Sequence, residues 1–305
     1  MDIIQNILNM VWARTEKLDT KRIASQSPTP GIAQICDIHY IDDSERGHLL
    51  DIYYPAETKK EDKLPVIIDI HGGGWMYGYK EINKYFCLKL AQKGFLVVNL
   101  NYRLANSVLF CEQIKDIFAA FNWLSDNLRN YPADTENVFL VGDSAGGHFA
   151  SVSVAVCVNK DFQRDFEVNA PAFEFKAVGA ISPAIDLISP NFMMNVQLKM
   201  LLGENFKQSK FYKYMDYKNL ADFRLPPFYI VTSDGDFIQK QAYKLKKVLT
   251  EYNVENIFEN YTDKINGKKL PHVFGVVDPY SEPASRFIST MTEFFKSKMK
   301  ETADK

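Results

Sequence analysis

The sequence has few of the features that mark secreted, membrane-spanning or metal-dependent proteins. Four cysteines occur in 305 residues, and none of them forms a C-x-x-C pair or keeps a regular spacing to a histidine. These spacings argue against a disulfide framework and against a zinc site, so we expect reduced thiols, no metal and no cofactor. No run of 18 apolar residues is present, so we expect no stable membrane insertion.

The sequence also lacks an excess of charge of either sign. It carries 36 basic and 38 acidic residues, which gives a net charge of −2. This balance argues against nucleic acid or an anionic membrane as a general partner. With 46% hydrophobic and 13% aromatic residues, the chain is expected to bury a large core rather than to be disordered.

The N-terminal segment MDIIQNILNMVWART lacks the main features of a secretory signal. It has no basic n-region, polar residues Gln5, Asn6 and Asn9 interrupt its apolar run, and no small-residue cleavage site follows closely. We therefore expect mature sequence in a cytoplasmic protein. Apolar residues at positions 4, 7, 8 and 11 recur at helical spacing and predict an amphipathic helix over residues 2–18.

Beyond residue 65, short apolar runs alternate with helical patterns. The patterns predict strands at 66–70, 95–100, 137–141, 177–181, 228–232 and 256–260, and helices at 80–93, 109–129, 145–158, 238–252 and 281–299. This alternation is typical of an α/β protein, with a mostly parallel sheet covered by helices on both faces. Two earlier β-type runs, 35–41 and 49–54, predict an antiparallel hairpin at a sheet edge.

Residues 184–220 break the alternation. They predict two short helices, rich in Met, Phe and Tyr, over the carboxyl edge of the sheet, where ligands bind in such folds. Methionines at 193, 194, 200 and 215 fit two interpretations equally well: an adaptable apolar pocket, or the core of the segment itself.

The strongest chemical signal is the run Gly142-Asp-Ser-Ala-Gly-Gly147. It contains G-x-S-x-G between a predicted strand and a predicted helix, which is the context of a nucleophile elbow. Glycines permit the sharp turn that exposes the serine hydroxyl, and the helix N-terminus favours developing negative charge. We therefore predict Ser144 as a nucleophile rather than part of a plain Gly-rich turn.

A second glycine-rich loop, His71-Gly-Gly-Gly-Trp75, directly follows the strand VIIDI. Three glycines expose backbone N–H groups that can hold the oxyanion of a tetrahedral intermediate. A phosphate-binding loop would need G-x-G-x-x-G or a Walker lysine, and neither is present. For His71 itself we favour a structural role in shaping the loop over a catalytic one.

A nucleophilic serine requires a general base and an acid that orients it. In this architecture the chain order is Ser, then Asp or Glu, then His, and two of the five histidines follow Ser144. His148 lies one helical turn along and is expected to point away from the elbow. His272, in a loop before the last helix, is therefore the predicted base.

The acid is expected just after a strand that lies between the serine and the base. The strand FYIVT leads into Ser233-Asp-Gly-Asp-Phe237, which offers two carboxylates. Asp236 sits at the crest of the loop before a helix, whereas Asp234 is also suited to capping the turn. We favour Asp236.

The motifs HGGGW, Asn101-Tyr-Arg-Leu-Ala105 and GDSAGG, followed by the Asp236 loop and His272, resemble the hormone-sensitive-lipase-type branch of the α/β-hydrolase carboxylesterases. The resemblance runs from about Leu49 to the last helix. Two departures stand out. The usual proline after the N-Y-R-L-A run is missing, and the histidine loop reads HVF where HGF is commoner.

The resemblance implies an α/β-hydrolase fold with an eight-stranded sheet, formed by residues 1–305 as a single domain. It implies Ser144, Asp236 and His272 as the catalytic triad, and the N–H groups of Gly73, Gly74 and Ala145 as the oxyanion hole. It further implies a small helical cap from residues 1–30 and 184–220 that shapes the acyl pocket. The expected substrate is a small-molecule ester with a short-to-medium acyl group.

Several alternatives stay open at this point. The same triad would serve a small amidase or formamidase, and a ligand-binding homologue would keep the fold without catalysis. A purely structural protein would leave three motifs without explanation. The apolar face of helix 2–18 has two expected partners, the cap or a second copy of the chain in a homodimer.

Overall fold

The computed structural model describes residues 2–27, 29–188, 192–262 and 267–300. Within them lies an eight-stranded sheet in the order β1-β2-β4-β3-β5-β6-β7-β8. The strands are β1 (Ile32–His39), β2 (Leu49–Pro55), β3 (Leu64–Ile70), β4 (Leu96–Leu100), β5 (Ala133–Asp143), β6 (Phe175–Ile181), β7 (Phe228–Ser233) and β8 (Asn256–Tyr261). The pairs β1–β2 and β2–β4 are antiparallel and the other neighbouring pairs are parallel, so the predicted mostly parallel sheet with an edge hairpin is confirmed.

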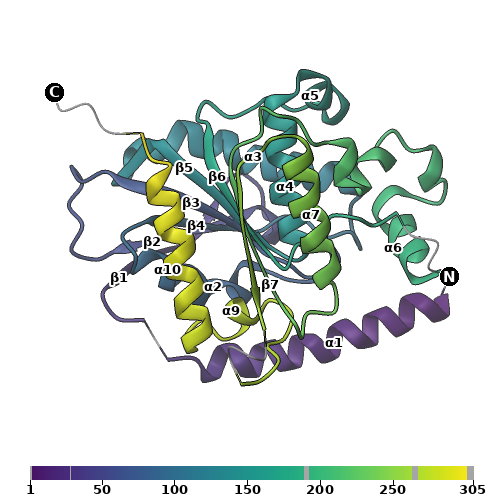
Figure 1. The fold of residues 1–305 in the computed structure, drawn as a ribbon, viewed down its shortest axis with the longest axis horizontal. Helices are drawn as coiled ribbons and strands as arrows, with labels where there is room; N and C mark the ends of the chain where they lie inside the picture. The colour runs from purple at the N-terminus through teal and green to yellow at the C-terminus, as the bar shows by residue number, and fades with distance from the viewer. Residues whose placement is uncertain (1, 28, 189–191, 263–266, 301–305) are drawn as a thin grey trace.

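Helices cover both faces of this sheet (Figure 1). They are α1 (Asp2–Ser25), α2 (Lys84–Ala91), α3 (Phe110–Asn127), α4 (Ala145–Val158), α5 (Lys160–Phe166), α6 (Phe192–Leu202), α7 (Gln239–Glu251), α9 (Phe274–Val277) and α10 (Glu282–Ser297). Side chains of α3, α4 and α7 belong to one apolar core, and those of α2 and α10 belong to a second. The two cores lie on opposite faces of the sheet.

The strands divide their side chains between the two cores by simple alternation. In β3, Ile68 and Ile70 face the first core and Ile67 faces the second. The alternation follows from the two-residue period of a strand, and the nearly continuous apolar sequence follows from burial on both faces. The last residues of each strand are therefore packed on both faces of the sheet. This packing fixes the position at which each following loop begins.

Several predicted boundaries differ from the structure. The helix predicted at 80–93 is a 3₁₀ turn, Lys80–Ile82, followed by α2. The buried Lys80 ammonium of this turn lies 2.8–2.9 Å from carboxylate oxygens of Asp37, Asp51 and Glu81. The short helices α5 and α9 were not predicted. In the described part of residues 184–220, which leaves out 189–191, one α-helix, α6, and three 3₁₀ turns stand where two short helices were predicted.

The N-terminal helix α1 extends to Ser25, beyond the predicted end at residue 18. It crosses one end of the molecule, and its N-terminal end lies near α6 (Figure 1). Arg22 ties it to the body of the protein by donating a hydrogen bond to the carbonyl of Ile82 at 3.1 Å. Among the described helices, none is both long enough and apolar enough to cross a membrane.

Candidate active site

Ser144 stands in a sharp turn between β5 and α4. Its backbone is in a strained conformation, with φ of 52° and ψ of −115°. A Cβ on Gly142 would lie 2.3 Å from the carbonyl oxygen of Gly146, and one on Gly146 would lie 1.9 Å from that of Ile70 in β3. Glycine is therefore required at both positions, and the turn is the nucleophile elbow that the G-x-S-x-G spacing predicts.

The imidazole of His272 links the serine to an acid. Ser144 Oγ lies 2.9 Å from Nε2 of His272, and Nδ1 of the same ring lies 2.7 Å from Oδ1 of Asp236. The three side chains come from three separate loops, 128 and 36 residues apart along the chain. The structure thus brings together the three residues that we predicted as nucleophile, base and acid.

Asp236 is buried and held by several donors. Its Oδ2 accepts a hydrogen bond from Thr232 Oγ1 at 2.8 Å, and its Oδ1 accepts one from the N–H of Ile238 at 3.0 Å. Burial by itself raises the pKa of Asp236, but the hydrogen bonds from His272 and Ile238 outweigh it and hold the pKa below the ordinary value. Asp236 is thus ionised at neutral pH and suited to stabilise an imidazolium.

The competing carboxylate, Asp234, faces elsewhere. Its Oδ1 accepts hydrogen bonds from the side-chain amides of Gln239 at 3.0 Å and Asn260 at 2.8 Å. Asp234 therefore ties the loop to α7 and β8, which is the structural role that the sequence left open for it.

The glycines of the HGGGW loop have backbone conformations that other residues rarely adopt. Gly73 has φ of 117°, and a Cβ on it would lie 1.9 Å from the carbonyl oxygen of Tyr77. Gly74 follows with φ of 59° and borders the same cavity as Ser144. Within the described residues, the N–H groups of Gly73, Gly74 and Ala145 have no protein acceptor, so all three are available to an oxyanion.

Sequence reasoning missed the carboxylate next to the nucleophile. Asp143 Oδ1 accepts hydrogen bonds from the N–H of Gly72 at 2.9 Å and from the amide of Asn83 at 2.8 Å. It therefore joins the elbow to the HGGGW loop. Asn83 also donates to Oδ2 of Asp69 at 2.8 Å, so one amide bridges two buried carboxyl groups.

Both of these acids sit in surroundings that disfavour ionisation. Burial, together with the nearby charge of Asp143, raises the pKa of Asp69 to about 8, and burial raises the pKa of Asp143 as well. An acid within the otherwise apolar strand VIIDI was the sequence signal for this network.

The other two histidines near the loop are structural. His71 Nδ1–H donates to the carbonyl of Gly72 at 2.7 Å, and its ring stacks on Tyr102. His148 Nδ1 accepts from Trp75 Nε1 at 3.2 Å, so its Nε2–H donates to the carbonyl of Tyr214 at 2.9 Å. Burial lowers the pKa of each ring to about 4, so both are neutral at pH 7.

A cavity of about 510 Å³ opens beside Ser144. Residues of α1 and of the segment after β6 form much of its wall, so both segments predicted as cap elements border it. The residues concerned are Trp12, Thr15, Asp19, Arg22, Ala184, Leu187, Met194 and Gln197. Met215 is fully buried in the core, which separates its role from that of Met194 in the wall. The side chain of Met193 lies outside the described residues.

The histidine loop departs from the family pattern at Val273, which borders the cavity. Val273 has a left-handed backbone, with φ of 48° and ψ of 36°. Glycine takes up this conformation without strain, whereas a β-branched residue does so at a cost of about 1–2 kcal/mol. The HVF sequence thus places an apolar side chain beside His272 at the expense of backbone strain.

Among the described residues, no group of three or more histidine, cysteine or acidic side chains is arranged to hold a metal ion.

The BD-FAE family model matches residues 50–249 of the chain. A solved structure of esterase B from Lactobacillus rhamnosis, inhibited by a tributyrin phosphonate, is 27% identical with a TM-score of 0.91. The similarity covers 97% of this chain and 96% of that one.

Two curated relatives are more distant in sequence. Versiconal hemiacetal acetate esterase from Dothistroma septosporum is 24% identical over 79% of this chain and 76% of that protein. Esterase LipQ from Mycobacterium tuberculosis is 25% identical over 67% of this chain and 49% of that protein. The chain spans less than half of the length of several such relatives.

Proposed function

The chain belongs to the BD-FAE family of α/β-hydrolase esterases, and on this premise we propose that it is a serine carboxylesterase that cleaves esters of short-to-medium acyl groups. One observation carries the proposal. Two hydrogen bonds connect Ser144, His272 and Asp236 beside a cavity. Ser144 Oγ lies 2.9 Å from His272 Nε2, and His272 Nδ1 lies 2.7 Å from Asp236 Oδ1. The whole-chain similarity to a phosphonate-inhibited esterase supports the same conclusion.

In the proposed reaction, His272 removes the proton of Ser144 while Oγ attacks the ester carbonyl carbon. The carbonyl oxygen becomes an oxyanion and accepts hydrogen bonds from the N–H groups of Gly73, Gly74 and Ala145. Each such donor contributes roughly 3 kcal/mol by analogy with measured oxyanion holes. Asp236 holds His272 in the tautomer whose Nε2 accepts the proton and stabilises the imidazolium that forms.

The intermediate collapses when His272 gives the proton to the leaving alcohol oxygen, which breaks the ester C–O bond and leaves an acyl group on Ser144. His272 then takes a proton from water, whose oxygen attacks the acyl carbon, and Ser144 is released with its proton restored. Apolar side chains such as Leu187 and Met194 in the wall suit an alkyl acyl group. We propose that residues 1–30 and 184–220 act as the cap over this pocket.

The test is hydrolysis of p-nitrophenyl esters from C2 to C12 by the wild type and by Ser144→Ala. We expect a peak at C2–C6 and a fall in kcat of roughly 10⁶-fold in the variant, as for loss of the nucleophile in other serine hydrolases. An unchanged thermal transition would show that the variant is folded.

A C4 alkyl phosphonate supplies an independent readout. It should label the wild type with a stoichiometry of one and leave Ser144→Ala unlabelled. A folded wild type that cleaves no ester and takes up no label would overturn the proposal, and would point to the amide or ligand-binding alternatives. Ester turnover retained by Ser144→Ala would overturn it equally.

A further inference from the structure

The catalytic cavity ends at a pair of stacked aromatic rings. Trp12 of α1 lies on Tyr77, two residues after the HGGGW loop, with ring centroids 5.3 Å apart and planes within 6°. A Cβ on Gly74 would lie 3.2 Å from two ring carbons of Trp12, so the indole also covers the backbone of a proposed oxyanion donor. Tyr77 is also held by α1 through a hydrogen bond, because its hydroxyl donates to Asp19 Oδ2 at 2.9 Å.

A second cavity of about 310 Å³ lies against the same two rings. Trp12 and Tyr77 border both this cavity and the catalytic one, so the stacked pair is the partition between them. Besides the two rings, the second cavity is lined by apolar Ala13, Met76, Leu104 and Met200 and by polar Glu16 and Asn106. Its apolar residues offer contacts to an alkyl chain.

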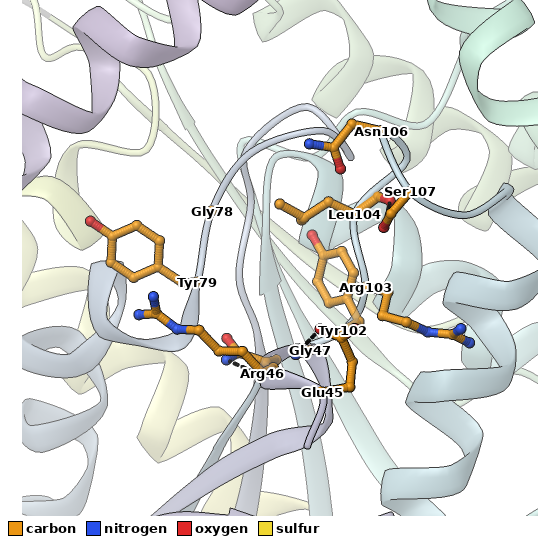
Figure 2. A pocket seen from close by; sticks show the side chains of 11 residues that line it. Glu45, Arg46, Gly47, Gly78, Tyr79, Tyr102, Arg103, Leu104, Asn106 and Ser107 are labelled. Atoms are coloured by element: carbon orange, nitrogen blue, oxygen red, sulfur yellow. Dashed lines mark hydrogen bonds between the residues drawn. The ribbon is translucent and has the colours of Figure 1, made fainter. Parts of the chain in front are cut away.

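The second cavity continues into a third, of about 260 Å³, which shares Gly78, Tyr79, Leu104 and Asn106 with it. Figure 2 shows this outer end, with Tyr79 and Leu104 on opposite sides of the backbone at Gly78. Arg46 and Asn106 bring polar groups to the same opening. The second and third cavities thus form one path on the far side of the two stacked rings. Its side chains change from apolar ones such as Met76 and Met200 to polar ones such as Arg46.

The chemistry of the proposed reaction decides which part of the substrate meets the partition. His272 must protonate the leaving oxygen, so the alcohol lies beside the imidazole, where the ring of Phe237 packs at 4.5 Å from that of His272. An acyl chain that extends past Gly74 meets the indole of Trp12 on α1, because a Cβ on Gly74 would lie 3.2 Å from two ring carbons of that indole.

We propose that the stack of Trp12 on Tyr77 is the wall that limits the length of the acyl chain this enzyme accepts. The inference rests on the proposed esterase function and assigns specificity to two named side chains. Removing either ring joins the two cavities and gives a longer chain room to extend.

The test is Trp12→Ala assayed on p-nitrophenyl esters from C2 to C12. Each methylene that enters apolar surroundings improves binding roughly fourfold. We therefore expect the ratio of kcat/KM for C10 to that for C4 to rise by roughly tenfold or more. Tyr77→Ala removes the other half of the partition and should shift the ratio in the same direction.

Two further variants separate the wall from other effects. Trp12→Phe keeps an aromatic ring and removes Nε1, which is buried and has no hydrogen-bond partner in the described part of the chain, so it should retain the wild-type chain-length profile. Leu18→Ala changes an exposed apolar residue of the same helix, 61% accessible, and should leave activity and profile unchanged. Circular dichroism and thermal transitions show whether each variant is folded.

An equal loss of activity at every chain length in folded Trp12→Ala and Tyr77→Ala would overturn the proposal, because it would show a purely structural role. A wild type that cleaves no ester of any length would overturn both this inference and the proposed function. An unchanged profile in active variants would overturn this inference alone.

Discussion

The two sides of the cavity beside Ser144 are built in opposite ways. The floor is the elbow with α4, in which every residue from Ala145 to Val156 is buried. The roof includes α1, in which none of the described side chains from Met10 to Ser25 is buried. A helix that is apolar all round is held on every side, whereas a helix on the surface depends on a few contacts. The proposed chemistry lies in the floor, and the proposed selection of substrate lies in the roof.

This contrast has a physical reason. The proposed reaction requires atoms held within a few tenths of an ångström, which buried glycine contacts and strands fixed on both faces provide. Selection of an acyl chain requires a wall of suitable shape, which a single helix supplies. Variants of the floor should therefore abolish activity or stability, and variants of the roof should alter preference.

After Ser144→Ala, the largest effect is expected for Asp236→Asn, in the loop after β7 that holds His272. The amide keeps the volume of the carboxylate but no longer stabilises the imidazolium or enforces the required tautomer, so kcat should fall roughly 10⁴-fold. The matched control is Asp234→Asn, two residues away, whose carboxylate contacts Gln239 and Asn260 instead of the base. It should keep kcat within a few-fold of wild type. A larger loss in the control would reverse the assignment of the acid.

The same two residues show where sequence reasoning succeeds and where it stops. Strand ends, loop order and G-x-S-x-G are local signals, so the sheet, α4 at 145–158 and the positions of Ser144, Asp236 and His272 were predictable. Contacts between distant segments leave no such signal. The placing of Trp12 on Tyr77, and of Asn83 between two acids, depends on packing across 65 and 60 residues of chain.

The boundaries that were wrong have the same origin. The apolar repeat of α1 stops at Val11, because the next residues to face the cavity include polar ones, Thr15, Asp19 and Arg22. The inward face of α1 carries these polar residues because it lines a cavity rather than the apolar core. The helix therefore continues to Ser25 without the pattern that marks a helix in sequence.

A second comparison of floor and roof uses one substitution, glycine to alanine, in each. In Gly146→Ala the new Cβ would lie 1.9 Å from the backbone oxygen of Ile70, so α4 must move away from β3 and about 3 kcal/mol or more of stability should be lost. Gly203, after α6, has φ of 87° and nothing within 4 Å. Gly203→Ala should therefore cost about 1 kcal/mol, from backbone conformation alone. Urea unfolding of both variants measures how much each substitution lowers the free energy of unfolding. Similar losses in the two variants would contradict the proposed difference between floor and roof.

A pH-dependent effect concerns Asp69, a buried acid of β3 that one amide joins to Asp143 beside the elbow. The folded-state pKa of Asp69, about 8, lies above its ordinary value of 3.8, so between these values the folded chain holds a proton that the unfolded chain has lost. The stabilising contribution of the protonated acid is complete below about pH 4 and is lost as the pH rises toward 8, at up to about 1.4 kcal/mol per pH unit. Asp69→Asn resembles the protonated acid at every pH and preserves an acceptor for Asn83.

The free energy of unfolding of Asp69→Asn should thus exceed that of the wild type by an amount that grows with pH. We expect the difference to rise by about 1 kcal/mol or more between pH 5 and pH 7, measured by urea unfolding at each pH. Asp126→Asn, at an exposed position of α3, is the matched control and should follow the wild-type curve. A difference that stays constant with pH would mean that the floor holds Asp69 ionised. The Asn83 amide would then bridge the negative charges of Asp69 and Asp143 next to Ser144. The electrostatic field of these two carboxylates would then contribute to the proposed stabilisation of the His272 imidazolium.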